Sequence, residues 1–268
     1  MAENNFSLQK TLTMLLDEKK YHSLRDILST MNPADIAAIF DDLDQACLPL
    51  LFRLLPKELA AETFVEMEPE AQELLIRGFS DSELKEVIDE LYVDDAVDIV
   101  EEMPANVVQR ILSQAEPDMR KQINEILRYP EDSAGSIMTT EYVSLRPNMT
   151  VEEAILRIRR TGIDKETIYT CYVTRGHKLI GLTSVKDLLL CEDDDATIES
   201  IMQEHVITVG TLDDKEQVAQ MFSKYNFLAL PVVDTENRLV GIVTFDDAMD
   251  VMEDEATEDM EKMAAMLP

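Results

Sequence analysis

The chain has 268 residues, of which 46% are hydrophobic, so it is long and apolar enough to form two or three domains with buried cores. Its 55 acidic residues outnumber its 24 basic residues and give a formal net charge of −31. That excess argues against nucleic acid as a partner and against docking on anionic lipid, because both need a basic protein surface. Cations, or a basic surface on another protein, fit the charge.

No segment of the sequence is expected to enter or target a membrane. Residues 1–10 lack a basic start followed by an apolar run. The longest stretch without a charged residue is nine residues long, at 225–233, whereas a span needs about 20 apolar residues. The chain as given is therefore expected to be soluble, without direct membrane insertion. We also expect no enzyme, because the three cysteines are far apart and no motif such as H-E-x-x-H or G-x-S-x-G occurs.

The first half of the chain repeats every twelve residues. The markers of the period are Met31, Leu43, Leu55, Met67, Phe79, Leu91 and Met103. Eight positions after each marker come Ile39, Leu51, Thr63, Leu75, Val87, Ile99 and Ile111, and nine positions after come Phe40, Phe52, Phe64, Ile76, Ile88, Val100 and Leu112. Twelve residues accommodate about nine helical residues and a tight turn. The pattern predicts stacked short helices over about 22–128, with a plain helical bundle as the alternative.

Prolines and capping residues support the short-helix interpretation. Several prolines come just after the markers, where they suit the first turn of a helix. They are Pro33, Pro56, Pro69 and Pro104. We expect Asn32, and either Ser80 or Asp81, to be N-caps.

The helical pattern ends at residues 129–136, which we predict to be a linker after a helical domain at 1–128. Pro130 disfavours helix at Tyr129, and a Ser-Ala-Gly-Ser run then supplies small, flexible residues.

The second half contains a duplicated unit. One copy begins at Ile137 with IMTTEYVSLRPNMTVEEAILRI, and the other begins at Ile201 with IMQEHVITVGTLDDKEQVAQMF. After a short extended lead-in, each copy reads as helix, strand, strand, helix, because alternation and β-branched residues predict strands. We expect the hairpin turns at His-Lys in the first copy and at Thr-Glu-Asn-Arg in the second. The copies are assigned to 137–198 and 199–252.

The chain closes on an acidic stretch, TFDDAMDVMEDEATEDMEK at 244–262, with nine carboxylates in sixteen positions. The spacing of its apolar residues predicts one helix. On that helix Asp247, Asp250, Asp254 and Glu258 fall on one side, where each like-charge pair costs about 0.2–0.5 kcal/mol. A divalent cation would relieve this repulsion.

Two motifs link the sequence to known families. The element Gly, apolar, any, Ser/Thr, any, any, Asp occurs once in each copy, at 181–187 and 241–247, and on it the duplicated unit resembles a tandem of cystathionine-β-synthase (CBS) domains. The junction YPEDSAGSIMT at 129–139, with LYVDDAVDIVEEM before it and the acidic stretch after it, resembles the MgtE family of magnesium channels and transporters. This resemblance covers nearly the whole chain.

The resemblance implies a fold of class α plus α/β. A right-handed superhelical solenoid of short helices would precede the CBS pair, and 253–268 would be the acidic start of a connecting helix. It implies a homodimer through the CBS domains at the cytoplasmic face of the cell membrane, and a membrane domain that follows Pro268. It also implies that Mg²⁺ bridging the acidic surfaces favours a closed state, and that loss of Mg²⁺ opens the pore.

The resemblance also implies which oxygens bind Mg²⁺, an ion that keeps several waters and needs only one or two carboxylates. Asp94 and Asp98 are four residues apart, so both can face one ion on a helix. Asn226 stands where an aspartate is expected and offers an amide oxygen without charge. The expected ligands are Glu62, Asp94, Asp98, Asp214, Glu216, Ser223 through its backbone oxygen, Asn226, Asp247, Asp250, Glu255, Glu258 and Asp259. Any single acid could instead lie on a solvated helix face.

CBS pairs often bind adenosine nucleotides, so the resemblance implies ATP as a second ligand. The matching residues in the first copy are Ser184, Lys186 and Asp187, where the lysine adds a phosphate partner. The spacing at Ser184 and Thr244 also fits a helix N-cap. Two alternatives to a magnesium sensor therefore stand. One is an adenine-nucleotide-binding CBS regulatory module, and the other is a non-catalytic acidic adaptor solenoid that docks a basic partner.

Overall fold

The computed structural model describes the backbone of residues 2–41 and 43–265, and within those ranges the side chains of 2–7, 9, 164, 259, 261 and 265 lie outside the description. Contacts divide the chain into two compact units. One comprises residues 1–91 and 95–121, and the other comprises 92–94 and 122–268. The order of the elements confirms the prediction of a helical region followed by two strand-containing copies.

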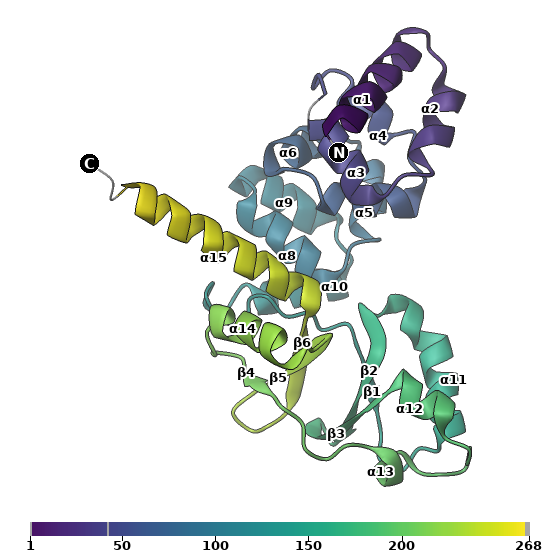
Figure 1. Ribbon diagram of the computed structural model, residues 1–268, viewed down its shortest axis with the longest axis vertical. Helices are drawn as coiled ribbons and strands as arrows, with labels where there is room; N and C mark the ends of the chain where they lie inside the picture. The colour runs from purple at the N-terminus through teal and green to yellow at the C-terminus, as the bar shows by residue number, and fades with distance from the viewer. Residues whose placement is uncertain (1, 42, 266–268) are drawn as a thin grey trace. The chain divides into compact units, whose positions relative to one another are not determined.

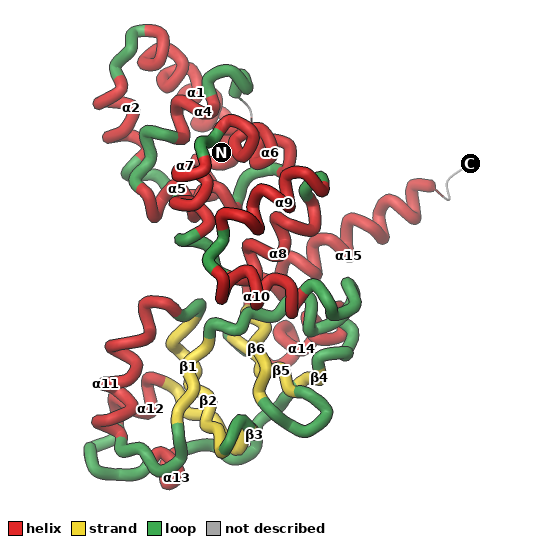
Figure 2. The backbone as a smooth tube through the Cα atoms, turned by 180° about the vertical axis from the view of Figure 1, so that it is seen from behind, coloured by secondary structure: helices red, strands yellow, loops and turns green. Residues whose placement is uncertain are grey.

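The first unit is built from short helices joined by short loops (Figures 1 and 2). They are α1 (Ala2–Asp17), α2 (Tyr21–Leu28), α3 (Pro33–Asp41), α4 (Leu48–Phe52), α5 (Lys57–Val65), α6 (Pro69–Gly78), α7 (Asp81–Ile88), α8 (Val93–Glu102), α9 (Ala105–Gln114) and α10 (Pro117–Ile126). The first two residues of α8 and the last five of α10 belong to the second unit. From α5 to α10 each helix begins twelve residues after the one before, which confirms the predicted period.

The repeated positions form the core of this unit. All seven residues that follow a marker by eight positions are buried, from Ile39 at 2% exposure to Ile111 at 3%. Phe52 contacts Phe64 of the next repeat, with ring centroids 6.0 Å apart, and the marker Phe79 three repeats later, with ring centroids 5.4 Å apart. Each short helix therefore buries its apolar stripe against its neighbours in the stack.

Helix α4 departs from the period. It begins at Leu48 rather than twelve residues after α3, and it has only five residues. Pro49 explains the departure, because a proline inside a helix lacks an N–H donor and clashes with the preceding turn. The helix can therefore start only where Pro49 falls in its first turn.

The predicted N-caps are confirmed. The Asn32 Oδ1 accepts a hydrogen bond from the Ala34 N–H at 3.0 Å. Ser80 caps α7, since its hydroxyl accepts from the Glu83 N–H while the Glu83 carboxylate accepts from the Ser80 N–H. This reciprocal capping box stabilises the start of a helix.

The second unit contains the two copies, each with a three-stranded sheet. The first copy comprises β1 (Tyr142–Leu145), α11 (Val151–Thr161), the 3₁₀ helix η1 (Gly162–Asp164), β2 (Thr167–Arg175), β3 (Lys178–Ser184) and α12 (Val185–Leu190). After α13 (Ile198–Ile201), the second comprises β4 (Val209–Gly210), α14 (Lys215–Tyr225), β5 (Ala229–Val233), β6 (Leu239–Thr244) and α15 (Phe245–Ala265). In both copies the first strand pairs parallel with the second, which pairs antiparallel with the third.

The hairpin turns fall close to their predicted places. In the first copy the turn is Gly176–His177, one residue earlier than the predicted His-Lys, because Lys178 already pairs with Arg175 across the strands. Both turn residues have positive φ angles, 58° and 73°, as a two-residue hairpin turn of type I′ requires.

The two sheets share a buried core. Tyr172 is fully buried between them and packs edge-on against Tyr142, with ring centroids 6.0 Å apart. The Tyr142 hydroxyl donates to the Leu239 carbonyl at 3.3 Å and so ties the first copy to the second. The pair of copies is therefore one packed body.

The lead-in of each copy pairs with the other copy's sheet. Thr139 exchanges two backbone hydrogen bonds with Ile242, at 2.8 and 2.9 Å, and Gln203 exchanges two with Leu182, at 2.8 and 3.0 Å. The glycine of each CBS element faces the methionine of the opposite lead-in, so that a Cβ on Gly241 would lie 2.6 Å from the Met138 Sδ. This exchange explains why the element needs glycine.

The Ser-Ala-Gly-Ser run is packed rather than flexible. Ala134 is fully buried, and its N–H donates to the Asp213 carbonyl at 2.7 Å. A Cβ on Gly135 would lie 2.5 Å from the Tyr129 Cγ. The small residues therefore allow close packing against the second copy. The prediction that this run is flexible is wrong. The domain boundaries themselves stay a prediction.

The acidic stretch forms one continuous helix, as predicted: α15 runs from Phe245 to Ala265. Among the helices that the structure describes, none combines the length and the apolar character needed to cross a bilayer.

Candidate functional site

The two aspartates of α8 differ in exposure. Asp94, in the first turn of the helix, is only 6% exposed, whereas Asp98, one turn later, is exposed. Both side chains interact with other residues of the chain. Glu62, on α5, is exposed. Of these three expected ligands, Asp98 and Glu62 are open to solvent and hence to a hydrated ion.

The acids at the start of α14 have local partners. The Asp214 Oδ1 accepts from the Gln217 N–H at 3.0 Å, which makes Asp214 the N-cap of the helix. The Glu216 Oε1 accepts from the Gln220 Nε2 at 3.0 Å. Both acids are exposed. Each carboxylate uses only part of its acceptor capacity in these bonds, so each can still coordinate a cation.

The end of α14 accounts for the asparagine that departs from the family pattern. Asn226 is the C-cap and adopts the left-handed conformation, with φ 55° and ψ 44°, while its N–H donates to the Phe222 carbonyl at 2.8 Å. Asparagine tolerates this conformation better than most residues do. Ser223 lies in the last turn, where the backbone carbonyl groups have no N–H partner within the helix. The sequence reasoning missed this cap, although an asparagine at the end of a helical pattern is a known stop signal.

The start of α15 carries a half-buried carboxylate. The Asp247 Oδ2 accepts from the Thr244 hydroxyl at 2.5 Å and from the Thr244 N–H at 3.2 Å. Burial raises the pKa of Asp247 to about 6, and repulsion from Asp246 and Asp250 adds to the rise, while the Thr244 hydroxyl opposes it. A cation near these carboxylates would counter both the burial and the repulsion.

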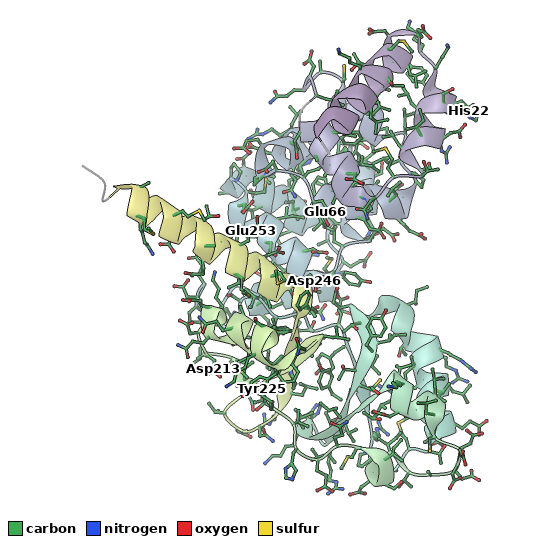
Figure 3. All side chains as sticks on the ribbon, in the orientation of Figure 1. His22, Glu66, Asp213, Tyr225, Asp246 and Glu253 are labelled. Carbon is green, nitrogen blue, oxygen red and sulfur yellow. The ribbon has the colours of Figure 1, made fainter. Side chains whose placement is uncertain are left out.

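Farther along α15 the acids face different surroundings. Figure 3 labels Asp246 at the start of the helix and Glu253 farther along it. Asp250 is exposed, Glu255 is half-buried, and the Glu258 Oε1 pairs with the Lys262 Nζ at 2.5 Å. The Asp259 side chain, also an expected ligand, lies outside the described residues.

In the part of the chain that the structure describes, no group of three or more His, Cys, Asp or Glu side chains is arranged to hold a metal ion. The structure does bring Asp247 and Asp250 together within one turn of α15, whereas Asp214 and Glu216, two residues apart at the start of α14, have separate partners. Single carboxylates or such a pair suffice for a largely hydrated Mg²⁺, which binds through one or two carboxylates. They would not suffice for an ion that needs a full protein cage.

The expected nucleotide residues form a helix cap. The Ser184 hydroxyl donates to the Asp187 Oδ2 at 2.6 Å and accepts from the Asp187 N–H at 3.0 Å, a capping box at the start of α12. Thr244 and Asp247 share the hydroxyl-to-carboxylate bond at the start of α15. The N-cap interpretation from the sequence is therefore confirmed for Ser184, whereas the Thr244 hydroxyl and N–H both donate to the Asp247 carboxylate. Lys186 and Asp187 remain exposed, so they are accessible to a ligand.

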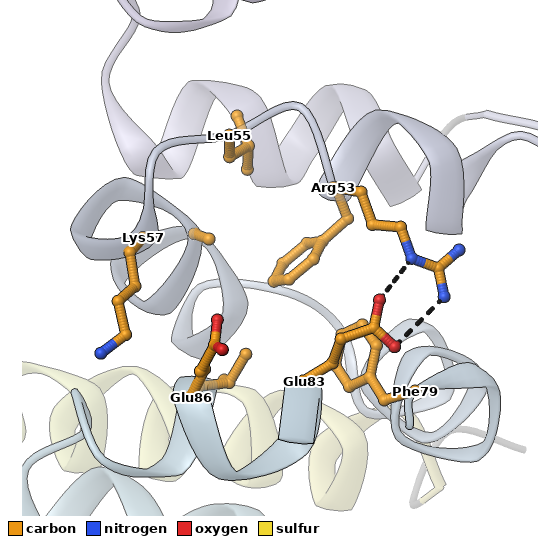
Figure 4. Close-up of a pocket in the computed structure, with 9 residues that line it drawn as sticks. Arg53, Leu55, Lys57, Phe79, Glu83 and Glu86 are labelled. Atoms are coloured by element: carbon orange, nitrogen blue, oxygen red, sulfur yellow. Dashed lines mark hydrogen bonds and ion pairs between the residues drawn. The ribbon is translucent and has the colours of Figure 1, made fainter. Parts of the chain in front are cut away.

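A cavity of about 360 Å³ lies in the first unit, between α4, α5 and α7 (Figure 4). Its wall is apolar at Phe52 and Phe79, and it also carries the charged residues Arg53, Lys57, Glu83 and Glu86. The Arg53 Nε donates to the Glu83 Oε1 at 2.7 Å, and this bond, with those from Ser80, lowers the pKa of Glu83 to about 2. The Lys57 Nζ binds the Glu90 Oε1 at 2.6 Å, so both cations of this cavity are held in ion pairs.

Comparison with known proteins decides the family. The MgtE intracellular N domain matches residues 31–132, and the CBS domain matches 134–192 and 198–254. The magnesium transporter MgtE of Thermus thermophilus is 39% identical over 97% of this chain and 58% of its own length, and that of Bacillus subtilis is 32% identical over 95% of this chain and 56% of its own. The solved cytosolic domain of the Mg²⁺ channel MgtE in complex with ATP has a TM-score of 0.85 and 38% identity, covering 91% of this chain and 99% of that one. This chain belongs to the MgtE family.

A second structure, the soluble part of a magnesium transporter, gives a TM-score of 0.84 at 33% identity and covers 96% of this chain and all of that one. The resemblance drawn from the sequence and the predicted fold class are therefore confirmed. The chain corresponds to the cytosolic part of an MgtE protein and spans about half the length of the curated relatives it matches.

Proposed function

We propose that this chain is the Mg²⁺-sensing regulatory region of an MgtE magnesium transporter or channel, and that it is not an enzyme. Mg²⁺ bound between the acidic N domain, CBS pair and connecting helix favours the closed state, and its loss lets these surfaces repel and the pore open. The acidic helix α15 carries the proposal. Its nine carboxylates are balanced by one lysine, Lys262, which pairs with Glu258.

The expected ligands belong to this proposal. Acids such as Asp98, Asp214 and Asp250 are exposed, so a hydrated ion can reach their carboxylates, and one or two carboxylates are enough for each Mg²⁺. Stabilisation of the closed state follows from mass action, because the ion binds the closed state more tightly than the open one.

Small-angle scattering of the 268-residue chain across a magnesium series tests the proposal. We expect the radius of gyration to decrease as the solution changes from chelator to on the order of 10 mM Mg²⁺. Millimolar concentrations suit an ion that keeps most of its waters and binds through one or two carboxylates. The double variant Asp98→Asn with Asp250→Asn should shift the midpoint to higher Mg²⁺. The matched control, Glu192→Gln with Asp194→Asn, removes the same charge from an exposed loop and should follow the wild type. An unchanged profile across the whole series would contradict the sensor and favour the acidic adaptor.

Asn226 allows a sharper test of one ligand position. Asn226→Asp restores the charge expected in the family and should lower the Mg²⁺ midpoint, whereas Asn226→Gly keeps the left-handed cap and removes the oxygen. If both variants respond to Mg²⁺ as the wild type does, position 226 is not a ligand.

A second ligand, ATP, is proposed for the first CBS copy at Ser184, Lys186 and Asp187. It is supported by the ATP complex of the MgtE cytosolic domain at 38% identity and by the exposed Lys186 beside the capping box. Calorimetry with ATP should show weaker binding in Lys186→Gln and unchanged binding in Lys165→Gln, which removes the same charge elsewhere in the copy. Equal affinities in both variants would place ATP elsewhere.

We also propose a homodimer through the CBS copies and action on a membrane domain in the full-length protein. The dimer is supported by large apolar side chains on α12, where Leu189 is 65% and Leu190 is 70% exposed. Sedimentation should show a dimer that the double variant Leu189→Glu with Leu190→Glu weakens. A monomeric wild type would contradict this part of the proposal.

A further inference from the structure

A pocket in the first CBS copy is positively charged although the chain is strongly acidic. It has a volume of about 580 Å³ and lies where β1 and β2 end and the hairpin turns. Its charged lining consists of Arg146, Arg157, Arg175, His177 and Glu199, and we name it the arginine pocket. The volume falls in the range of about 300–1,000 Å³ that is usual for ligand sites.

The three arginines reach the pocket from three elements. Arg146 follows β1, Arg157 lies on α11, and Arg175 ends β2. Since β1 and β2 run parallel as neighbours, their carboxyl ends meet at one edge of the sheet. The convergence is thus a result of the fold and not of adjacency in the sequence.

The positive charges outnumber their partners. The Arg175 Nη2 pairs with the Glu199 Oε1 at 2.6 Å. Among the residues that the structure describes, Arg146 and Arg157 form no ion pair within 4.0 Å. Leaving His177 aside, the lining has three guanidinium groups against one carboxylate. Two positive charges therefore face the pocket without a protein anion.

The second copy provides an internal comparison. When the two lead-ins are aligned, Arg146 corresponds to Gly210 and Arg157 corresponds to Met221. At the end of its second strand the first copy has Arg175, and just after the corresponding strand the second copy has Asp234. The same fold forms without these cations, so they are not needed for folding. Residues 137–198 carry eight Lys and Arg and ten Asp and Glu, so this copy contributes only −2 to the chain's charge of −31.

The arginine pocket is separate from the proposed nucleotide residues. Ser184 pairs with Thr170 at one end of the β2–β3 hairpin, while Lys178 pairs with Arg175 at the other. The six residue steps between Lys178 and Ser184 correspond to about 20 Å along the strand. A ligand at one end does not occupy the other.

We propose that the arginine pocket binds a small anion carrying phosphate groups. Guanidinium groups present paired N–H donors that match phosphate oxygens. The hydroxyls of Ser144 and Thr174, which also line the pocket 3.1 Å apart, add uncharged donors. The proposal goes beyond the Mg²⁺-sensing function and does not depend on it.

Calorimetry of the 268-residue chain with pyrophosphate, in Mg²⁺-free buffer, tests the proposal. Arg146→Gln and Arg157→Gln should each weaken binding by at least about tenfold, which corresponds to about 1.4 kcal/mol. The matched control is Arg160→Gln, on the same helix α11 but not in the lining, which should bind as the wild type does. The arginines are exposed, and thermal melts followed by circular dichroism check that the variants fold.

Several results would overturn the proposal. Absence of binding at about 10 mM pyrophosphate would do so. Equal weakening by Arg160→Gln would also do so, because it would show only non-specific attraction by the positive charges of this copy. Binding lost in Lys186→Gln but kept in Arg157→Gln would assign pyrophosphate to the nucleotide residues. A change of oligomeric state in Arg146→Gln without pyrophosphate binding would assign the pocket to an acidic protein surface.

A parallel titration with ADP identifies the source of the phosphate groups. Affinity for ADP above that for pyrophosphate, and reduced by Arg157→Gln, identifies a nucleotide. Equal affinities identify phosphate groups alone, and both results support the proposal.

Discussion

Gly241→Ala tests the exchange of lead-ins between the two CBS copies. A Cβ at this position would lie 2.6 Å from the Met138 Sδ and 2.8 Å from the Thr139 carbonyl oxygen, whereas ordinary contacts begin at 3.4 Å. The methionine can rotate away, but the carbonyl is part of the backbone. Two hydrogen bonds between Thr139 and Ile242, at 2.8 and 2.9 Å, hold that backbone against the sheet. The lead-in must therefore shift by about half an ångström or more and strain both bonds.

The expected cost is about 2–3 kcal/mol. Overpacking of a core costs about 1–3 kcal/mol, and a ladder hydrogen bond contributes about 1 kcal/mol. Urea unfolding followed by circular dichroism measures this loss of stability: the urea midpoint of the second unit should be lower in Gly241→Ala than in the wild type. Gly181→Ala should behave alike, since its Cβ would lie 2.9 Å from the Gln203 carbonyl oxygen. Gly78→Ala is the control, because a Cβ there meets nothing within 4 Å. Equal midpoints for Gly241→Ala and Gly78→Ala would refute the reasoning.

Two further predictions concern single side chains. Asn226→Ala should cost about 1–2 kcal/mol in urea unfolding, because alanine is strained at the left-handed φ of 55°, and Asn226→Gly should cost less than about 0.5 kcal/mol. A cost for Gly equal to that for Ala would show that the cap conformation is not what selects asparagine. Cys171 should be alkylated far more slowly than Cys47 and Cys191, because it is fully buried and burial raises the pKa of its thiol to about 12. Peptide mapping after timed iodoacetamide treatment measures the rates, and similar rates would contradict the burial.

Periodicity predicted the helical unit because each short helix depends on residues that are close together in the sequence. The twelve-residue spacing determines which side chains share a helix face, and the ladder from Ile39 to Ile111 is buried as expected. The same reasoning failed at α4, where Pro49 overrides the period. It also failed at Ala134 and Gly135, because small residues suit both a flexible linker and tight packing. Only the neighbours, such as Tyr129, distinguish the two.

Sequence reasoning could not predict which sheet each lead-in joins. The Ile-Met pair that opens each copy is the same, so alternation identifies an extended segment but not its partner. Met138 packs into the core of the second copy, and Met202 packs against that of the first. This pairing is a long-range choice governed by packing, and no local pattern encodes it.

The candidate ligands were predicted as positions, and their surroundings were not. Spacing placed Asp94 and Asp98 on one side of a helix, but not that Asp94 is buried and Asp98 exposed. Likewise, the sequence predicted a cap at Thr244 and a ligand at Asp247, without showing that the two residues bind each other. The structure shows Thr244 donating two hydrogen bonds to Asp247, and these bonds do not exclude a metal ligand, because a carboxylate that accepts two hydrogen bonds retains further lone pairs.

Asp247→Asn distinguishes the cost of the bare carboxylate from its use as a ligand. Burial raises the pKa of Asp247 from 3.8 to about 6 in the folded chain. Because the folded-state value lies above the unfolded one, the stability that the protonated group contributes is complete below about pH 4 and is lost as the pH rises through about 6. The full shift corresponds to at most about 3 kcal/mol, and partial exposure reduces this to about 1–2 kcal/mol.

In chelator, the asparagine variant should therefore match the wild type near pH 4 and exceed it by about 1–2 kcal/mol at about pH 7.5, as measured by urea unfolding. Asp246→Asn removes a neighbouring exposed charge and should gain less. With Mg²⁺ in the order of 10 mM, the wild type should recover the difference if Asp247 binds the ion, because only the wild type then gains binding energy. A variant that is no more stable than the wild type in chelator would show that the buried carboxylate carries no cost, and repulsion among these acids could then not act as the switch.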